Sequence, residues 1–152
     1  MTKVLDKLGN LLGVGRLLPA YMLFGLLKHL VPLRLLARWA WCRPGGWRDR
    51  DRDGERRLHR RVIRLGQLVG LPDRDCLQRS LLLYRTLSRA GANPMLVIGF
   101  DRMNGRIFGH AWVVVDGHAV IESESDLLRF SPVLAFGWQG ALLSPPPEVR
   151  GA

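Results

Sequence analysis

The fold is decided by residues 71–94, which read LPDRDCLQRSLLLYRTLSRAGANP. Asp73 or Asp75, following a proline, is typical of a helix start, because an N-cap carboxylate accepts hydrogen bonds from free backbone N–H groups. Gly91 suits the C-terminal cap. Between these signals the apolar residues recur at helical spacing: Leu77, Leu81, Tyr84 and Leu87. The stretch therefore predicts a central helix that carries Cys76 in its first turn.

Strand signals follow this helix directly. Residues 95–100, 107–115 and 118–123 read MLVIGF, IFGHAWVVV and HAVIES. A turn over residues 101–106 separates the first two, and Asp116-Gly117 forms the tip of the second hairpin. Helices followed by an antiparallel sheet predict an α+β chain, with the central helix packed on a small sheet.

The segment before the central helix is rich in leucine and arginine. Pro19 and Pro32 predict three short helices within residues 4–41, because proline breaks the hydrogen-bond ladder of a helix. Another helix should begin at about Asp53 and end before Gly70.

Leucines at helical spacing form a stripe in this segment: Leu26, Leu30, Leu33 and Leu36. Two uses are open for the stripe, packing on the core or contact with a membrane surface or partner. We favour packing, because a small domain needs the buried area.

A length of 152 residues fits one domain. Within it we expect a helical N-terminal region over residues 1–64, a catalytic core over 65–145 and a loose tail over 146–152. The net charge of +10 lies wholly in the first 64 residues, since the rest carries equal numbers of acidic and basic residues.

This asymmetry indicates either a solvated basic surface or an anionic partner: lipid headgroups, nucleic acid or an acidic peptide. Nucleic acid is disfavoured, because acids alternate with the arginines and the nearby tryptophans lie among leucines.

The two cysteines, Cys42 and Cys76, form neither a disulfide framework nor a zinc pattern, and we predict no metal and no cofactor. There is no signal peptide and no GxxxxGK[ST] phosphate loop. The longest uncharged apolar stretch, Leu17 to Leu27, is eleven residues and too short to span a bilayer. We expect a cytoplasmic protein, with peripheral membrane contact through residues 1–41 left open.

Cys76 has two interpretations, a small packing residue or a nucleophile. A helix N-terminus stabilises a thiolate, and its N–H groups suit the oxyanion of an acyl-transfer reaction. Nucleophilic chemistry also needs a base. His110 is the candidate, because it lies in a strand between the small residues Gly109 and Ala111, which leave room for another group.

The acid depends on hairpin register. A two-residue turn at Asp116-Gly117 would place Ser123 opposite His110. A three-residue loop, with the glycine as a bulge, places Glu122 there instead, about 5 Å away at Cβ. We expect Glu122 to orient the imidazole; Glu124 is a weaker choice, as is an acid at the tip itself.

Residues 71–123 then show a resemblance to a known family. The pattern DCLQRSLLLYRTLSRAG followed by GHAWVVVDGHAVIES resembles the transglutaminase-like cysteine peptidases of lasso peptide maturation, the leader peptidases or B proteins in their split form. The resemblance implies a transglutaminase-like (papain-like) fold. It implies Cys76 as nucleophile, His110 as general base and acid, and Glu122 as the orienting acid, where the family usually has Asp.

The resemblance also implies the reaction: removal of the leader from a ribosomally made lasso precursor peptide, which frees the core amine for cyclisation. The winged-helix recognition module of fused members has no counterpart in residues 1–64. We therefore expect a separate leader-recognition protein, and a separate ATP-dependent lasso cyclase, as partners. Two alternatives stay open: an amidase or acyltransferase of the same superfamily, and a non-enzymatic basic membrane-surface adaptor.

Overall fold

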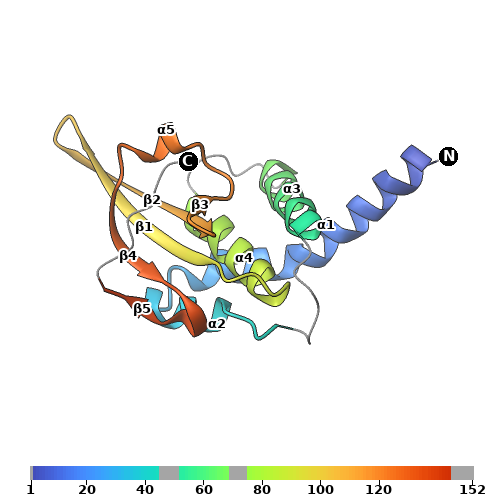
Figure 1. Ribbon diagram of the computed structural model, residues 1–152, viewed down its shortest axis with the longest axis horizontal. Helices are drawn as coiled ribbons and strands as arrows, with labels where there is room; N and C mark the ends of the chain where they lie inside the picture. Colours follow the sequence, from blue (N-terminus) through green and yellow to red (C-terminus); the bar gives the residue numbers. More distant parts are fainter. Residues whose placement is uncertain (1, 45–51, 69–74, 145–152) are drawn as a thin grey trace.

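A computed structural model describes residues 2–44, 52–68 and 75–144. Helices fill the first part of the chain: α1 (Thr2–Leu27), α2 (Leu33–Ala40), α3 (Arg52–Leu68) and α4 (Cys76–Arg89). A sheet follows, made of β1 (Met95–Met103), β2 (Arg106–Val115), β3 (His118–Ala119), β4 (Ser131–Phe136) and β5 (Leu142–Leu143). Two short helices, α5 (Glu124–Leu127) and the 3₁₀ turn η1 (Trp138–Gly140), flank β4. Figure 1 shows the helices gathered beside the sheet, which confirms the predicted α+β class.

The sheet is antiparallel throughout and has the order β3-β2-β1-β4-β5. Two-residue turns close both of its first hairpins. Asn104 and Gly105 have φ values of 52° and 74°, and Asp116 and Gly117 have 54° and 85°. Positive φ at both central residues is the type I′ pattern, which matches the twist of the flanking strands. The first turn is thus shorter than the predicted 101–106, because β1 continues to Met103.

The predicted register of the second hairpin is wrong. Val115 pairs with His118, so the turn has two residues and not three. The strand predicted over 118–123 ends at Ala119, after which the Val120 N–H still donates to the Val113 carbonyl at 2.9 Å. The position of Glu122 therefore depends on the path of the chain after β3 and not on a ladder.

The Cys-bearing helix α4 forms the centre of the core. Its leucines pack against the β2 side chains Ala111, Val113 and Val115, which alternate with those facing the other side of the sheet. At its C-terminus, the Gly91 N–H donates to the Ser88 carbonyl at 3.1 Å and the Ala92 N–H to the Leu87 carbonyl at 3.1 Å. This is a Schellman motif with Gly91 at φ 90°, as the glycine signal predicted.

The N-terminal helices differ from expectation at one proline. Pro32 precedes α2 as predicted, but Pro19 lies inside α1, which is 26 residues long and ends only at Leu27. The missing hydrogen bond is tolerated because Tyr21 and Phe24, just after the proline, are buried in the core and hold that part of the helix. None of the helices among the described residues is long and apolar enough to cross a membrane.

Three further predictions concern the helix after residue 52, the C-terminal tail and the leucine stripe. The third helix begins near Asp53 as predicted, whereas its stop at Gly70 and the tail 146–152 lie outside the described residues. The leucine stripe is split, since Leu36 is buried while Leu26 and Leu30 are exposed.

Candidate active site

Cys76 is the first residue of α4, and Asp75 occupies the N-cap position. The Asp75 side chain makes no capping hydrogen bond. It pairs instead with the Lys28 ammonium, which follows the C-terminus of α1. Asp75 therefore marks the helix start as predicted, but its side chain does not make the expected capping hydrogen bond, and Asp73 lies outside the described residues. The position predicted for Cys76, in the first turn, is correct.

His110 lies on β2 beside Cys76, and its imidazole forms a hydrogen bond with the thiol. The ring is mostly buried, with a side-chain exposure of 20%. Phe130 stacks on it with ring centroids 5.0 Å apart, and Trp112 lies at 6.0 Å. These two rings restrict the orientation of the imidazole.

Glu122 is the third member of this group. Its Oε1 lies 3.5 Å from Nε2 of His110. Because Nε2 faces the carboxylate, Nδ1 is the ring nitrogen left for the thiol. The structure thus brings together all three side chains predicted from the sequence, although the register that suggested Glu122 was wrong.

The ionisation of Cys76 follows from opposing effects. Burial by itself raises the pKa of the thiol. The hydrogen bond from His110, the backbone N–H groups of Ala111 and Leu77 and the charge of His110 together outweigh burial, so the pKa is lowered from 9.0.

The imidazole shows the complementary change. Hydrogen bonds to Cys76 and Glu122 raise the pKa of His110 to about 9, against burial, which lowers it. A lowered thiol pKa beside a raised imidazole pKa shifts the pair toward its thiolate–imidazolium form.

Arg79 is a site residue that the sequence analysis missed. Its Nη2 lies 3.0 Å from Oε1 of Glu122, the same oxygen that faces His110. Arg79 follows Cys76 by three residues, so both project from the same side of α4. The three-residue spacing from Cys76 was the signal in the sequence that could have identified Arg79. An arginine at that position is equally consistent with a solvent-exposed residue.

Hydrogen bonds attach the start of α4 to its neighbours. Ser80 donates to the Ala111 carbonyl at 2.9 Å, which ties the helix to β2. The Gln78 amide donates to the Tyr21 carbonyl at 2.7 Å, which ties it to α1. A Cβ at Gly25 would lie 2.7 Å from the Gln78 amide nitrogen, so a larger residue there would displace this side chain from its contact. These contacts hold Cys76 against the strand that carries His110.

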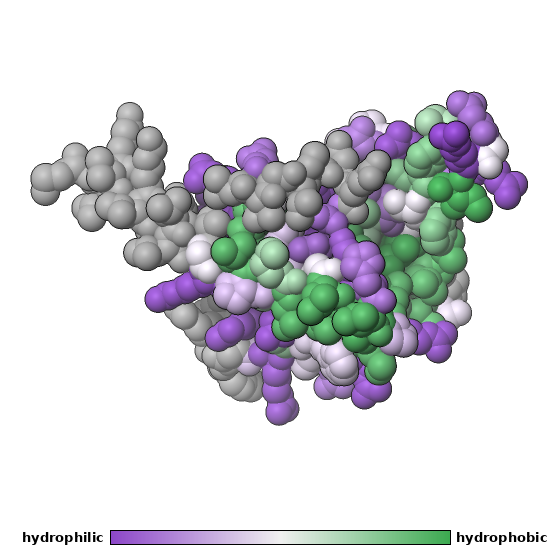
Figure 2. Space-filling view, turned by 180° about the vertical axis from the view of Figure 1, so that it is seen from behind, coloured by the Kyte–Doolittle hydropathy of each residue, from purple (hydrophilic) through white to green (hydrophobic). Residues whose placement is uncertain are grey.

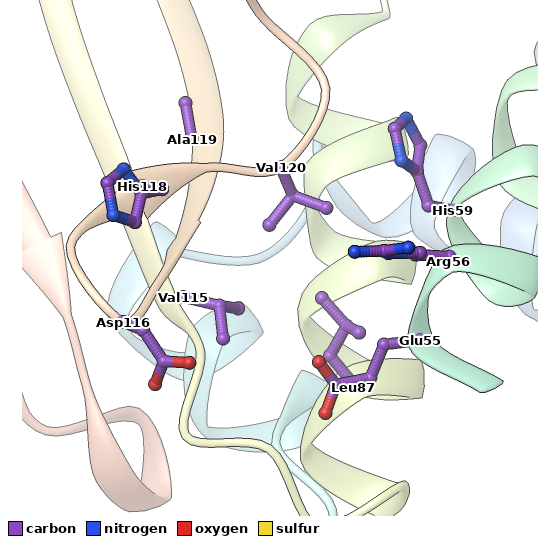
Figure 3. A pocket seen from close by; sticks show the side chains of 9 residues that line it. All are labelled: Glu55, Arg56, His59, Leu87, Val115, Asp116, His118, Ala119 and Val120. Carbon is purple, nitrogen blue, oxygen red and sulfur yellow. The ribbon is translucent and has the colours of Figure 1, made fainter. Parts of the chain in front are cut away.

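A pocket of about 420 Å³ lies apart from this group, between α3 and the β2–β3 hairpin. Leu87 in its lining is about three helical turns from the start of α4. Figure 3 shows Arg56 and His59 on the α3 side, opposite Asp116 and His118. This pocket mixes charges of both signs over an apolar floor and does not contain the thiol.

Of the other histidines, His29 is exposed after α1, His118 is in β3, and His59 is on α3, close enough to Glu122 for that carboxylate to act on its pKa. Burial lowers the pKa of His59, while Glu122 raises it and Arg60 lowers it. In the part of the chain that the structure describes, no three potential metal ligands cluster together.

The family model for the transglutaminase-like superfamily matches residues 18–135. The chain belongs to the transglutaminase-like superfamily. The matched range includes Cys76, His110 and Glu122, and it begins within helix α1. The same comparisons found no matching curated protein and no matching solved structure.

Proposed function

We propose that this transglutaminase-like protein is a cysteine peptidase that removes the leader from a lasso precursor peptide. The observation that carries the proposal is the contact of Cys76 with His110, which lowers the pKa of the thiol. Membership of the superfamily supports thiol-dependent acyl chemistry in general. The choice of a lasso leader rests on the resemblance of residues 71–123 described above.

The proposed reaction has two steps, formation of a leader thioester on Cys76 and its hydrolysis, and His110 transfers a proton in both. The Cys76 thiolate attacks the carbonyl carbon at the leader–core junction, and N–H groups at the start of α4 stabilise the oxyanion. The C–N bond breaks as His110 protonates the departing core amine. Water, deprotonated by His110, then attacks the leader thioester and releases the leader acid and the free thiol. Glu122 orients the imidazole throughout.

The proposed partners come from the family resemblance of residues 71–123. A separate leader-recognition protein delivers the precursor, and a separate ATP-dependent cyclase uses the amine that cleavage releases. No nucleotide step is assigned to this chain, whose sequence has no GxxxxGK[ST] loop.

Mass spectrometry of a lasso precursor peptide tests the proposal. The peptide is incubated with the protein, with and without a leader-recognition protein. We expect leader and core fragments whose summed mass exceeds the precursor by one water. Cys76→Ala should remove this activity while the circular dichroism spectrum stays unchanged, and Cys42→Ala serves as the matched control. Full cleavage by Cys76→Ala would contradict the proposal.

The superfamily match does not choose between water and an amine as acyl acceptor. Adding methylamine to the same reaction separates them: a methylamide of the leader would identify an acyltransferase, whereas the free acid identifies a peptidase. An intact precursor in every reaction would favour the non-enzymatic adaptor.

A further inference from the structure

Helix α1 has apolar side chains on two opposite faces. Tyr21 and Phe24 point into the core and are buried. Leu18, Met22 and Leu26, spaced four residues apart, are exposed on the other face. A helix that is apolar on all sides is normally buried on all sides. The outer face of α1 is therefore built for a contact that the described part of the chain does not make.

The exposed apolar surface continues into α2. Leu36 and Ala40 are buried, whereas Leu35 and Trp39, also four residues apart, are exposed. We call the combined surface the apolar face; its members are Leu18, Met22, Leu23, Leu26, Leu30, Leu35 and Trp39. Figure 2 shows hydrophobic side chains gathered on this side, over the end of α1 and over α2. Exposed patches of this kind mark interaction sites.

The charged residues within the segment that carries the apolar face all have one sign, although Lys28 of this segment pairs with Asp75 of the α4 start. The sequence contains no Asp or Glu between Asp6 and Asp49. The arginines of this segment that the structure describes are exposed: Arg16, Arg34, Arg38 and Arg43. Most protein interfaces have rims of mixed polarity. Leucine and tryptophan flanked in the sequence by exposed arginines match the surface of an anionic bilayer.

We propose that the apolar face is a peripheral docking surface for anionic lipid. The leucines and Trp39 enter the boundary between headgroups and acyl chains, and the arginines contact the phosphates. The helices lie on the membrane and do not cross it. This inference is independent of the peptidase proposal, because the apolar face contains neither Cys76 nor the side chains that contact it.

Vesicle flotation of the full-length protein tests this surface. The vesicles are phosphatidylcholine alone, or phosphatidylcholine with about 30% phosphatidylglycerol. We expect binding to the anionic vesicles, weaker binding to the neutral ones, and weaker binding in high salt. The double variant Leu26→Glu/Leu30→Glu should lower the apparent affinity about ten-fold or more, because it places charge where apolar contact is required.

The controls separate membrane contact from other causes. Leu26 and Leu30 are 61% and 71% exposed, so their replacement should leave the circular dichroism spectrum unchanged. Ile107→Glu is the matched control: Ile107 is 64% exposed, apolar and on the β1–β2 hairpin, and this variant should bind like the wild type. Equal binding by the double variant, or no vesicle binding at all, would overturn the proposal. So would a dimer in light scattering that the double variant abolishes without any vesicle binding, since the face would then serve a second copy.

Discussion

At the scale of single residues, one carboxylate oxygen serves two cations. Oε1 of Glu122 lies 3.0 Å from the Arg79 guanidinium and 3.5 Å from the His110 imidazole. The contact with the imidazole is the longer of the two, so Glu122 orients the ring and favours its charged form while Arg79 holds the carboxylate. Glu reaches this position with one methylene more than Asp.

The Glu122→Gln variant tests this role. The amide keeps the size of the side chain but loses the charge that stabilises the imidazolium. We expect kcat for precursor cleavage to fall about 10²-fold or more. Glu124→Gln, the alternative acid offered by the sequence, should cost far less. A larger loss in Glu124→Gln than in Glu122→Gln would show that Glu124, and not Glu122, orients His110.

The pH dependence of cleavage follows from the two pKa shifts. On the acid side, kcat/KM should fall as the Cys76 thiolate is protonated. This fall should occur at a pH below 9.0, the pKa of an ordinary thiol, because the pKa of Cys76 is lowered. On the alkaline side it should fall near 9, where His110 loses its proton. Glu122 contributes to the raised pKa of His110, so Glu122→Gln should move the alkaline limb to lower pH. An unchanged alkaline limb would show that the limb belongs to another group.

At the scale of secondary-structure elements, α4 contributes both the nucleophile and the support of the acid. Arg79 acts through Glu122 and is a positioning residue. We expect Arg79→Met to lower kcat by about ten-fold in the wild-type background, and by much less in the Glu122→Gln background. A double-mutant cycle on cleavage rates measures this coupling. Losses that simply multiply would indicate that Arg79 acts independently of Glu122.

The 3₁₀ turn η1 shows a second constraint between elements. Gly140 has φ 68°, and a Cβ there would lie 2.5 Å from the backbone nitrogen of Arg38 in α2. Its N–H also donates to the Tyr84 hydroxyl of α4 at 3.1 Å. Gly140→Ala should therefore lower the free energy of unfolding by about 3 kcal/mol or more.

Gly105→Ala is the matched control for that variant. Gly105 has a similar φ of 74° but open space around the position of a Cβ. Backbone strain alone should cost about 1 kcal/mol. Urea denaturation compares the two variants, and equal losses would mean that the close approach of η1 to α2 is not a constraint.

Local signals predicted the elements that depend on local physics. The period of α4, the Asp116-Gly117 turn and the glycine cap all reflect backbone preferences that a short stretch contains. The strand β4 was missed because Pro132 disfavours a strand. The structure accommodates this proline opposite Gly99, where the ladder between β1 and β4 shifts register.

Long-range packing explains the other errors. Pro19 stays helical because distant core residues hold α1, and Asp75 leaves its capping role because Lys28, 47 residues earlier, reaches it. Glu122 was chosen with the wrong register and still lies beside His110, since the chain bends there after β3 ends. The sequence thus identified the members of the site but not the geometry that brings them together.

At the scale of the whole molecule, the N-terminal helices and the Cys-bearing helix share one hydrophobic core. Tyr21, Leu36 and Val62 of the first three helices pack with Leu81 of α4 in the same cluster. The superfamily match begins at residue 18 and so includes part of these helices. The division at residue 64 stays a prediction. The shared core explains how α1 fixes the start of α4.

The two cysteines of the intact chain provide the most direct test of the central claim, that His110 activates Cys76. Both are partly buried free thiols, so each is an internal control for the other. Peptide mass spectrometry after timed iodoacetamide treatment at pH 7 measures their alkylation rates separately. We predict that Cys76 reacts faster than Cys42, and that His110→Ala removes most of this advantage without changing the rate of Cys42. Equal rates in the wild type, or a Cys76 rate unaffected by His110→Ala, would contradict the account.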